Sequence, residues 1–375
     1  MPIESGRREM GRAALFFEPG KPMTLTEFPV VEPGPGSVLV RVTRANVCGS
    51  DLHFWRGDGR LERWNRQDGA IIGHEMTGVV HALGEGVVTD WAGAPVAVGD
   101  RVVYQYFAPC GRCRACLRGM TPACPAALGR MFTDPHQPPH FNGAFADYYH
   151  VSPRMALFKV PDTVTDTMVA GANCALAQVI YGLERIGVGF GDTVVIQGAG
   201  GLGAYATAVA KERGAHQVIV IDGLDDRLAL ARAMGADATV DLREHPSPED
   251  RVGQVRALTN GWGADVVCEL VGFSEVIPEG LRMLAVGGRY LEIGTFYPGH
   301  SIDLDPGRLV AANQRIEAVM LYDAASLGAA VDFLARNAGR LPLDQVLVDY
   351  PLDQINEAFV DQLSSRSTRA SIVMT

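Results

Sequence analysis

The chain has 375 residues, of which 47% are hydrophobic and 20% are charged, and its formal net charge is −10. This length predicts two domains, and the composition is typical of a globular protein. The acidic balance, without a long basic cluster, argues against nucleic acid or an anionic membrane as a partner.

The sequence carries no signal for export or for a membrane anchor. No stretch reaches eighteen uninterrupted apolar residues, and residues 1–17 lack a long apolar region followed by a small-residue cleavage site. We therefore expect a cytoplasmic protein, in which clustered cysteines more often bind metal than form disulfides.

Residues 1–171 predict a β-rich first domain. Short alternating apolar runs at 37–47 and 99–107 are strand patterns, and Gly- and Pro-rich turns separate them. The loop 132–143 contains His136 and His140, which we interpret as part of a solvated loop rather than as metal ligands.

Three short segments carry residue types that suit a catalytic metal site. The segments "CGSDLH", "GHE" and "NC" contain Cys48, Ser50, Asp51, His53, His74, Glu75 and Cys174. A catalytic zinc ion takes three protein ligands and keeps one position open, and Cys48, His74 and Cys174 would supply such a set. Taken singly, Cys174 could be a small buried hydrophobe and His74 a buried histidine with hydrogen-bond partners.

Four cysteines lie close together in the segment "CGRCRACLRGMTPAC". Their pattern is C-x2-C-x2-C-x7-C, formed by Cys110, Cys113, Cys116 and Cys124. Four thiolates around zinc form a closed tetrahedral site with no position for substrate. An iron–sulfur cluster also uses four cysteines, whereas a redox C-x-x-C pair needs only two. The pattern therefore favours a structural zinc.

Residues 172–321 predict a doubly wound α/β domain, because apolar strands alternate with amphipathic helices. The segment "VVIQGAGGLGAYA" lies between a predicted strand and a predicted helix, and its turn contains Gly198, Gly200, Gly201, Leu202 and Gly203. Such a turn lets a pyrophosphate approach the helix N-terminus, although glycines can also be incidental in an α/β turn.

An acidic residue follows the glycine-rich turn at the spacing that suits NAD. Asp222 ends the next predicted strand, nineteen residues after Gly203, where a carboxylate can bind the ribose hydroxyls and repel a 2′-phosphate. Arg227 is the one nearby residue that could soften this preference. The segment therefore favours NAD over NADP.

Residues 322–375 return to a mixed pattern, with helices expected near 324–337 and 353–363. The first domain is thus expected to be discontinuous, comprising 1–171 and 322–375, with 172–321 inserted. The predicted fold class is α/β, a β-rich domain joined to a doubly wound domain with a parallel sheet.

Together, these motifs resemble the zinc-dependent alcohol dehydrogenases of the medium-chain dehydrogenase/reductase superfamily, over nearly the whole chain. The resemblance implies a GroES-like catalytic domain, a Rossmann NAD-binding domain and reversible hydride transfer between an alcohol and NAD. It implies a catalytic zinc on Cys48, His74 and Cys174, which Glu75 can join. The four clustered cysteines match the family's structural zinc, which makes two zinc ions per chain.

The resemblance also implies roles for residues around these sites. Ser50 would contact the reacting oxygen, and His53 would pass a proton outward. Asp51 is expected to orient the His74 imidazole, as carboxylates commonly do for metal-bound histidine. Residues implied around the nicotinamide are Val271, Gly272, Ile293, Gly294 and Thr295, and Arg369 is implied at the pyrophosphate.

The substrate is expected to be a secondary or bulky apolar alcohol. Polyol dehydrogenases of the superfamily commonly carry Glu, in "EPL", at the position of Cys174, whereas this chain has "CAL". Aromatic residues that could line the pocket or belong to the core are Phe54, Trp55, Tyr106 and Phe107.

Three alternatives stay open. They are a polyol, sugar or cyclitol dehydrogenase on the same scaffold, a zinc-free quinone or enoyl reductase relative, and a non-catalytic binding protein that retains the fold. The expected assembly is a homodimer or homotetramer.

Overall fold

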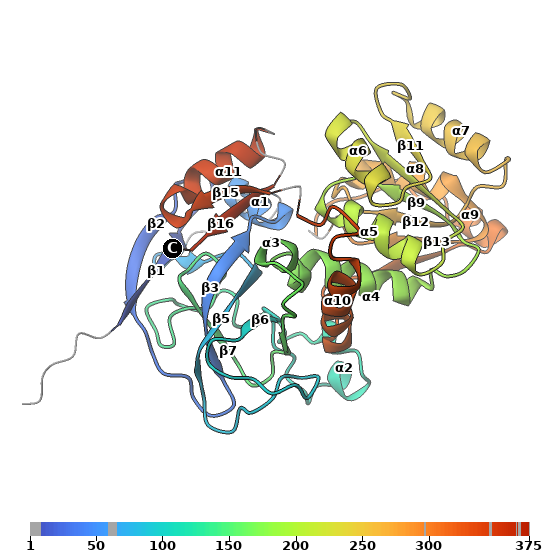
Figure 1. The fold of residues 1–375 in the computed structure, drawn as a ribbon. Helices are drawn as coiled ribbons and strands as arrows, with labels where there is room; N and C mark the ends of the chain where they lie inside the picture. The colour runs from blue at the N-terminus through green and yellow to red at the C-terminus, as the bar shows by residue number, and fades with distance from the viewer. Residues whose placement is uncertain are drawn as a thin grey trace, which may run out of the picture. The chain divides into compact units, whose positions relative to one another are not determined.

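A computed structural model describes residues 9–58, 66–295, 298–344, 347–364, 366 and 369–374. The chain divides into two units (Figure 1). The first comprises residues 1–174, 323–338 and 343–375, and the second comprises 175–322 and 339–342. No helix in the described part of the chain is long and apolar enough to span a lipid bilayer.

The first unit is built on a seven-stranded sheet. Its strand order is β15 (Val348–Pro351), β16 (Ala370–Val373), β3 (Val38–Asn46), β5 (Glu75–Leu83), β6 (Arg101–Tyr104) and β8 (Leu157–Lys159), and β7 (Tyr148–Val151) pairs with β3. A three-stranded sheet in the same unit has the order β2 (Thr24–Pro29), β1 (Met10–Phe16) and β4 (Ala70–Ile71). The expected β-rich first domain is therefore confirmed.

Strand register in the seven-stranded sheet brings distant segments together. Ser371 of β16 pairs with Asn46 of β3, and Asn46 pairs with Glu75 of β5. The helices of this unit are α1 (Gly49–Arg56), α2 (Arg114–Leu117), η2 (Thr121–Ala123), α3 (Asp166–Val169), α10 (Ala324–Asn337), η5 (Leu352–Gln354) and α11 (Ile355–Leu363), and η3 (Ala172–Leu176) spans its boundary with the second unit. The two helices expected near 324–337 and 353–363 are confirmed.

The loop 132–143 is more buried than its polar sequence suggests. The His140 side chain is 7% exposed, and its ring stacks on Phe28 at a centroid distance of 5.4 Å, next to the core residue Phe141. The expectation of a solvated loop is wrong for His140, because its ring is buried against the Phe28 side chain of β2. His136 is exposed, and its ring makes a T-shaped contact with Phe28.

The second unit contains a six-stranded sheet in which every neighbouring pair is parallel. Its order is β11 (Ala238–Asp241), β10 (Gln217–Asp222), β9 (Thr193–Gln197), β12 (Ala264–Glu269), β13 (Leu284–Glu292) and β14 (Arg315–Ala318). The first strand, β9, lies in the middle, with β10 and β11 added on one side and β12, β13 and β14 on the other, so the strand order reverses between β9 and β12 while all strands stay parallel. In open α/β sheets, ligands bind outside the carboxyl ends of the strands at such a point.

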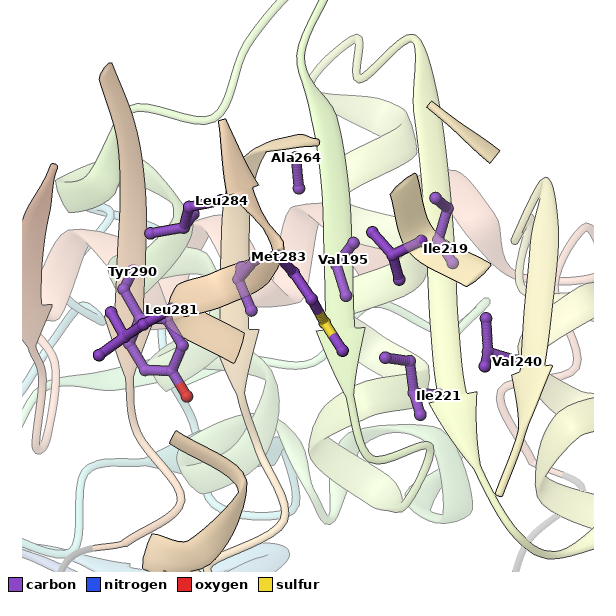
Figure 2. Close-up of a cluster of buried hydrophobic side chains, with 11 residues drawn as sticks. Val195, Ile219, Ile221, Val240, Ala264, Leu281, Met283, Leu284 and Tyr290 are labelled. Carbon is purple, nitrogen blue, oxygen red and sulfur yellow. The ribbon is translucent and has the colours of Figure 1, made fainter. Parts of the chain in front are cut away.

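Helices cover both faces of this sheet. On one face α4 (Ala177–Ile186), α5 (Gly201–Glu212) and α6 (Asp225–Ala233) contact one another in sequence. On the other are η4 (Ser274–Val276), α7 (Pro248–Leu258), α8 (Ile277–Met283) and α9 (Pro306–Ala312). Figure 2 shows the core beneath the second group, a single hydrophobic cluster that includes Val195, Ile219, Ile221, Leu281 and Met283. The predicted doubly wound parallel sheet is confirmed.

Strand pairing sets the boundary between α8 and β13. Helix α8 ends at Met283, and Leu284 begins β13 by pairing with Ala264 of β12. Both Leu284 and Ala264 are buried.

Candidate active site and cofactor site

The first candidate ligand lies where β3 gives way to α1. Cys48 is extended, with φ −81° and ψ 157°, and its backbone N–H donates to Asp51 Oδ2 at 2.9 Å. The other Asp51 oxygen, Oδ1, lies 3.3 Å from His74 Nδ1. One carboxylate therefore holds both the start of the helix and the imidazole, and the Asp51 side chain is almost fully buried, so water does not compete for these contacts.

His74 is positioned by the turn before β5. Gly73 has φ +87°, and a Cβ there would lie 2.7 Å from the Phe145 ring, so only glycine fits. The opposite imidazole nitrogen, Nε2, lies 3.5 Å from the Ser50 hydroxyl. The Tyr106 ring packs on the imidazole at a centroid distance of 4.8 Å.

Cys174 lies on a single π-helical turn, Ala172–Leu176, a feature that is frequent at functional sites. The neighbouring Asn173 side chain is fully buried. Its amide donates to the carbonyls of His74 (3.1 Å) and Tyr104 (2.9 Å), and its oxygen accepts from the Met76 N–H at 3.3 Å. Asn173 thus fastens the Cys174 turn to the strand that follows His74, a role that no pattern in the sequence indicates.

These contacts assemble the first of two candidate metal sites. One ligand atom from each of Cys48, His74, Glu75 and Cys174 lies within 4.8 Å of the others. A hydrogen bond from the Cys174 thiol lowers the pKa of Cys48 well below its ordinary value, which favours the thiolate that binds metal. Two thiols and an imidazole are a ligand set that zinc accepts in catalytic sites.

Glu75 adds a buried carboxylate to this site. Burial raises the pKa of Glu75 to about 8, although the Arg369 guanidinium donates to Oε2. The other oxygen, Oε1, is buried and has no hydrogen-bond partner in the described part of the chain. A divalent cation beside this oxygen would compensate the buried charge, so the residues present fit a metal ion.

His53 lies on α1 at the more exposed side of the site. Its Nδ1 lies 2.6 Å from Asp58 Oδ2 and 3.0 Å from the Arg56 guanidinium, which also pairs with Asp58. Burial lowers the pKa of His53, so its imidazole is neutral near pH 7 and can accept a proton. Asp58 is a second residue that the sequence analysis does not find.

The second candidate metal site is formed by the four clustered cysteines, whose sulfur atoms also lie within 4.8 Å of one another. Cys110 Sγ accepts from the Cys113 N–H at 3.3 Å, and Cys124 Sγ accepts from the Cys110 N–H at 3.3 Å. Backbone N–H groups lower the pKa of Cys110 to about 6. The thiols are free rather than disulfide-bonded, as a metal site requires.

The glycine-rich turn joins β9 to α5 in the second unit. Gly198 has φ +93°, and a Cβ on Gly203 would lie 1.9 Å from the Gly198 carbonyl oxygen. A Cβ on Gly200, the N-cap of α5, would meet no atom within 4 Å. The turn is therefore closed towards the sheet and open at the helix N-terminus, where Gly201 and Leu202 begin α5. The expected contact of this turn with a pyrophosphate stays a prediction.

Asp222 lies beside this turn, at the end of β10. Its carboxylate accepts backbone N–H groups from Ala199, Gly223 and Leu224 at 2.8–3.1 Å. The Arg227 guanidinium lies 3.8 Å from Asp222 Oδ2. These contacts hold the carboxylate at the carboxyl edge of the sheet, beside the glycine-rich turn.

The residues implied around the nicotinamide follow the next two strands at the same edge. Val271 and Gly272 come after β12, and Ile293, Gly294 and Thr295 come after β13. Arg369 belongs to the first unit and pairs with Glu75, and its contact with a pyrophosphate stays a prediction.

Comparisons with known proteins match both units. A family model described as an alcohol dehydrogenase GroES-like domain matches residues 34–162, and one described as a zinc-binding dehydrogenase matches residues 201–336. A 5-exo-hydroxycamphor dehydrogenase from Pseudomonas putida is 34% identical over 93% of this chain and 95% of its own length. The chain belongs to the zinc-binding medium-chain alcohol dehydrogenase family.

Other relatives of this dehydrogenase are named for different substrates. An L-threonine 3-dehydrogenase from Bacillus subtilis is 35% identical over 75% of this chain and 74% of its own length. An erythritol/L-threitol dehydrogenase from Mycolicibacterium smegmatis is 30% identical over 93% and 94%. The crystal structure of an alcohol dehydrogenase from Thermotoga maritima superposes with a TM-score of 0.89 at 28% identity, covering 98% of this chain and all of that one. The protein is a zinc-dependent oxidoreductase that acts on a CH–OH group.

Proposed function

We propose that this dehydrogenase oxidises a secondary or bulky apolar alcohol with NAD as the hydride acceptor. It would hold one zinc ion on Cys48, His74 and Cys174 and a second on the four clustered cysteines. The observation that carries the proposal is the convergence of two thiols and an imidazole beside the Ser50 hydroxyl. Bound zinc and NAD would supply Lewis-acid activation of the alcohol and a hydride acceptor.

The residues of α1 provide a route for the proton that the alcohol loses. Ser50 and His53 are three residues apart on this helix, so their side chains share a face. The Ser50 hydroxyl, next to His74, would accept the proton of the substrate hydroxyl while releasing its own towards the neutral His53 imidazole, which carries the proton onward. Asp58 holds the His53 ring through Nδ1.

The choice of NAD rests on Asp222. A carboxylate at the end of β10 accepts hydrogen bonds from ribose hydroxyls and repels a 2′-phosphate. The nearby cation, Arg227, is oriented towards Asp222, which reduces its attraction for a phosphate.

The choice of an apolar substrate rests on the residues beside the metal ligands. The Tyr106 ring covers His74, and Cys174 stands where polyol dehydrogenases carry Glu. The relative named for 5-exo-hydroxycamphor supports the same choice. The second candidate, a polyol dehydrogenase, is supported by the relative named for erythritol and L-threitol.

Metal content and substrate range test this function. The purified protein should hold two zinc ions per chain and should reduce NAD faster with cyclic and secondary alcohols than with polyols. Cys174→Ala should retain only one zinc ion and lose turnover. The matched control is Cys268→Ala, a buried cysteine of β12 outside both metal sites, which should keep both zinc ions and activity. Turnover by Cys174→Ala would contradict the proposed site, and strict use of polyols would favour the second candidate.

A further inference from the structure

Two glutamates end neighbouring strands at the carboxyl edge of the parallel sheet. Glu269 is the last residue of β12, Glu292 is the last residue of β13, and the two are paired in register. The Glu269 side chain is fully buried and that of Glu292 is mostly buried. Two acidic side chains without an assigned function therefore lie side by side where ligands bind in such sheets.

Glu269 binds the segments that follow both strands. Its Oε1 accepts from the N–H groups of Val271 (2.6 Å) and Gly272 (2.7 Å), and its Oε2 accepts from the Thr295 N–H (3.0 Å) and hydroxyl (3.3 Å). A Cβ on Gly294 would lie 2.5 Å from Glu269 Oε2, so this approach requires glycine. Four donors therefore converge on the Glu269 carboxylate.

Glu292 has the opposite surroundings. Its Oε1 accepts from the same Thr295 N–H, at 2.9 Å, and its Oε2 is buried without a hydrogen-bond partner in the described part of the chain. Two acceptors that share one N–H lie close together. Ionising both of two adjacent buried carboxylates costs free energy, because the two negative charges repel each other and neither is fully hydrated.

No cation offsets this charge within the described residues. Neither glutamate forms an ion pair with a described Lys, Arg or His. The strands on either side present Gln197 and Ala318, and the nearby Tyr290 hydroxyl donates to Gln197 at 3.0 Å. Other charged groups on or near these strands have their own partners: Arg251 of α7 pairs with Glu279 of α8, Arg289 of β13 pairs with Asp192, and Asp265 of β12 accepts the Thr193 N–H. Burial and the neighbouring Glu269 raise the pKa of Glu292 to about 9.

We propose that Glu292 carries a proton that it donates to Glu269, and that this acid pair holds the segments after β12 and β13 in the conformation that binds the nicotinamide end of the cofactor. Both glutamates are positioning residues. The proposal rests on the proposed function in one respect, because that function makes a nicotinamide the ligand of these segments.

The test measures NADH binding by fluorescence titration between pH 7.5 and 10. In the wild type, at pH values above 9, the dissociation constant of NADH should increase by up to about tenfold per pH unit. Loss of the Glu292 proton leaves two ionised carboxylates that repel each other. Across the whole pH range, Glu292→Gln should bind NADH with nearly the dissociation constant that the wild type has at pH 7.5, because the glutamine amide donates to Glu269 and does not titrate. Glu292→Ala, which lacks that donor, should bind about tenfold more weakly at pH 7.5.

Glu275→Gln is the matched control. Glu275 is an exposed glutamate in η4 near the same edge, and its substitution should leave the wild-type pH dependence unchanged. Other groups that titrate above pH 9 are the same in all variants. The ratio of the variant's dissociation constant to that of the wild type therefore reports the contribution of Glu292.

Thermal unfolding without cofactor gives an independent readout. A carboxyl whose pKa is raised in the folded protein contributes stability at low pH that is lost as the pH rises through that pKa. The melting temperature of Glu292→Gln should therefore rise relative to that of the wild type as the pH increases from 6 to 9, because only the wild type loses this contribution. If the melting temperatures of the two proteins changed equally with pH over this range, Glu292 would hold no proton and the proposal would be overturned.

The two readouts separate this proposal from the proposed function. A gain in unfolding temperature without any effect on NADH binding would overturn the positioning role. If the wild type failed to bind NADH at pH 7.5, the choice of NAD would be wrong, whereas the unfolding series would still decide whether the pair holds a proton.

Discussion

The candidate metal ligands depend on neighbouring side chains for their positions. Asp51 ties the start of α1 to His74, and Asn173 ties the Cys174 turn to the backbone after His74. Metal sites commonly depend on such supporting hydrogen bonds, which orient the ligands and set their basicity. Removing a support should therefore reduce metal binding even though every ligand remains.

Asn173→Ala tests this at the residue scale. The substitution leaves the His74 and Tyr104 carbonyls buried without a donor, so it should cost about 1–3 kcal/mol of unfolding free energy. It should also reduce zinc occupancy at one site. Asn356→Ala is the control, because Asn356 bonds the backbone N–H and carbonyl of Met23. Urea unfolding and metal analysis distinguish the two variants, and equal zinc retention in both would contradict a supporting role for Asn173.

At the scale of elements, the β9–α5 turn shows how close packing decides which residues a motif requires. Gly203 is needed because the first turn of α5 touches the Gly198 carbonyl, whereas Gly200 faces open space. The two glycines serve different purposes, one for packing and the other for access.

Gly203→Ala should separate α5 from β9. Its Cβ would overlap backbone, so we expect a loss of about 1–3 kcal/mol in stability and weaker NADH binding. Gly253→Ala is the control, because Gly253 lies inside α7 with no atom near its Cβ position. That variant should gain about 0.5–1 kcal/mol from helix propensity. Chemical denaturation measures both, and wild-type stability in Gly203→Ala would show that the turn can relax.

At the scale of the whole molecule, the chain forms two units with separate cores. Both candidate metal sites lie in the first unit, within residues 1–174. Metal binding should therefore stabilise this unit directly, because a bound metal adds its binding free energy to folding.

Cys113→Ser should expose this dependence. Loss of the four-thiolate site should cost at least about 2 kcal/mol, since loss of a metal is among the largest single-mutation effects. Hydrogen exchange should increase in peptides covering 105–130, while peptides covering 193–222 in the second unit should exchange as in the wild type. Treatment with a zinc chelator should reproduce this pattern. Unchanged exchange in 105–130 would contradict a structural metal there.

The fold was predictable because its signals are local. The alternation of strands and helices, the glycine-rich turn and the spacing of the four cysteines each extend over a few to about fifteen residues, and the parallel sheet is confirmed. The boundary between α8 and β13 was not predictable, because the pairing of Leu284 with Ala264 is not visible in periodicity.

The family, the two kinds of unit and the residue types available as ligands could be predicted from the residues alone, because they depend on composition and short-range spacing. Which residues support the ligands depends on how distant segments pack in the folded chain. Asn173 reaches His74, 99 positions away, and Glu269 meets Glu292 because two parallel strands end in register. Such contacts depend on strand register and burial, which arise when segments far apart in the sequence pack together.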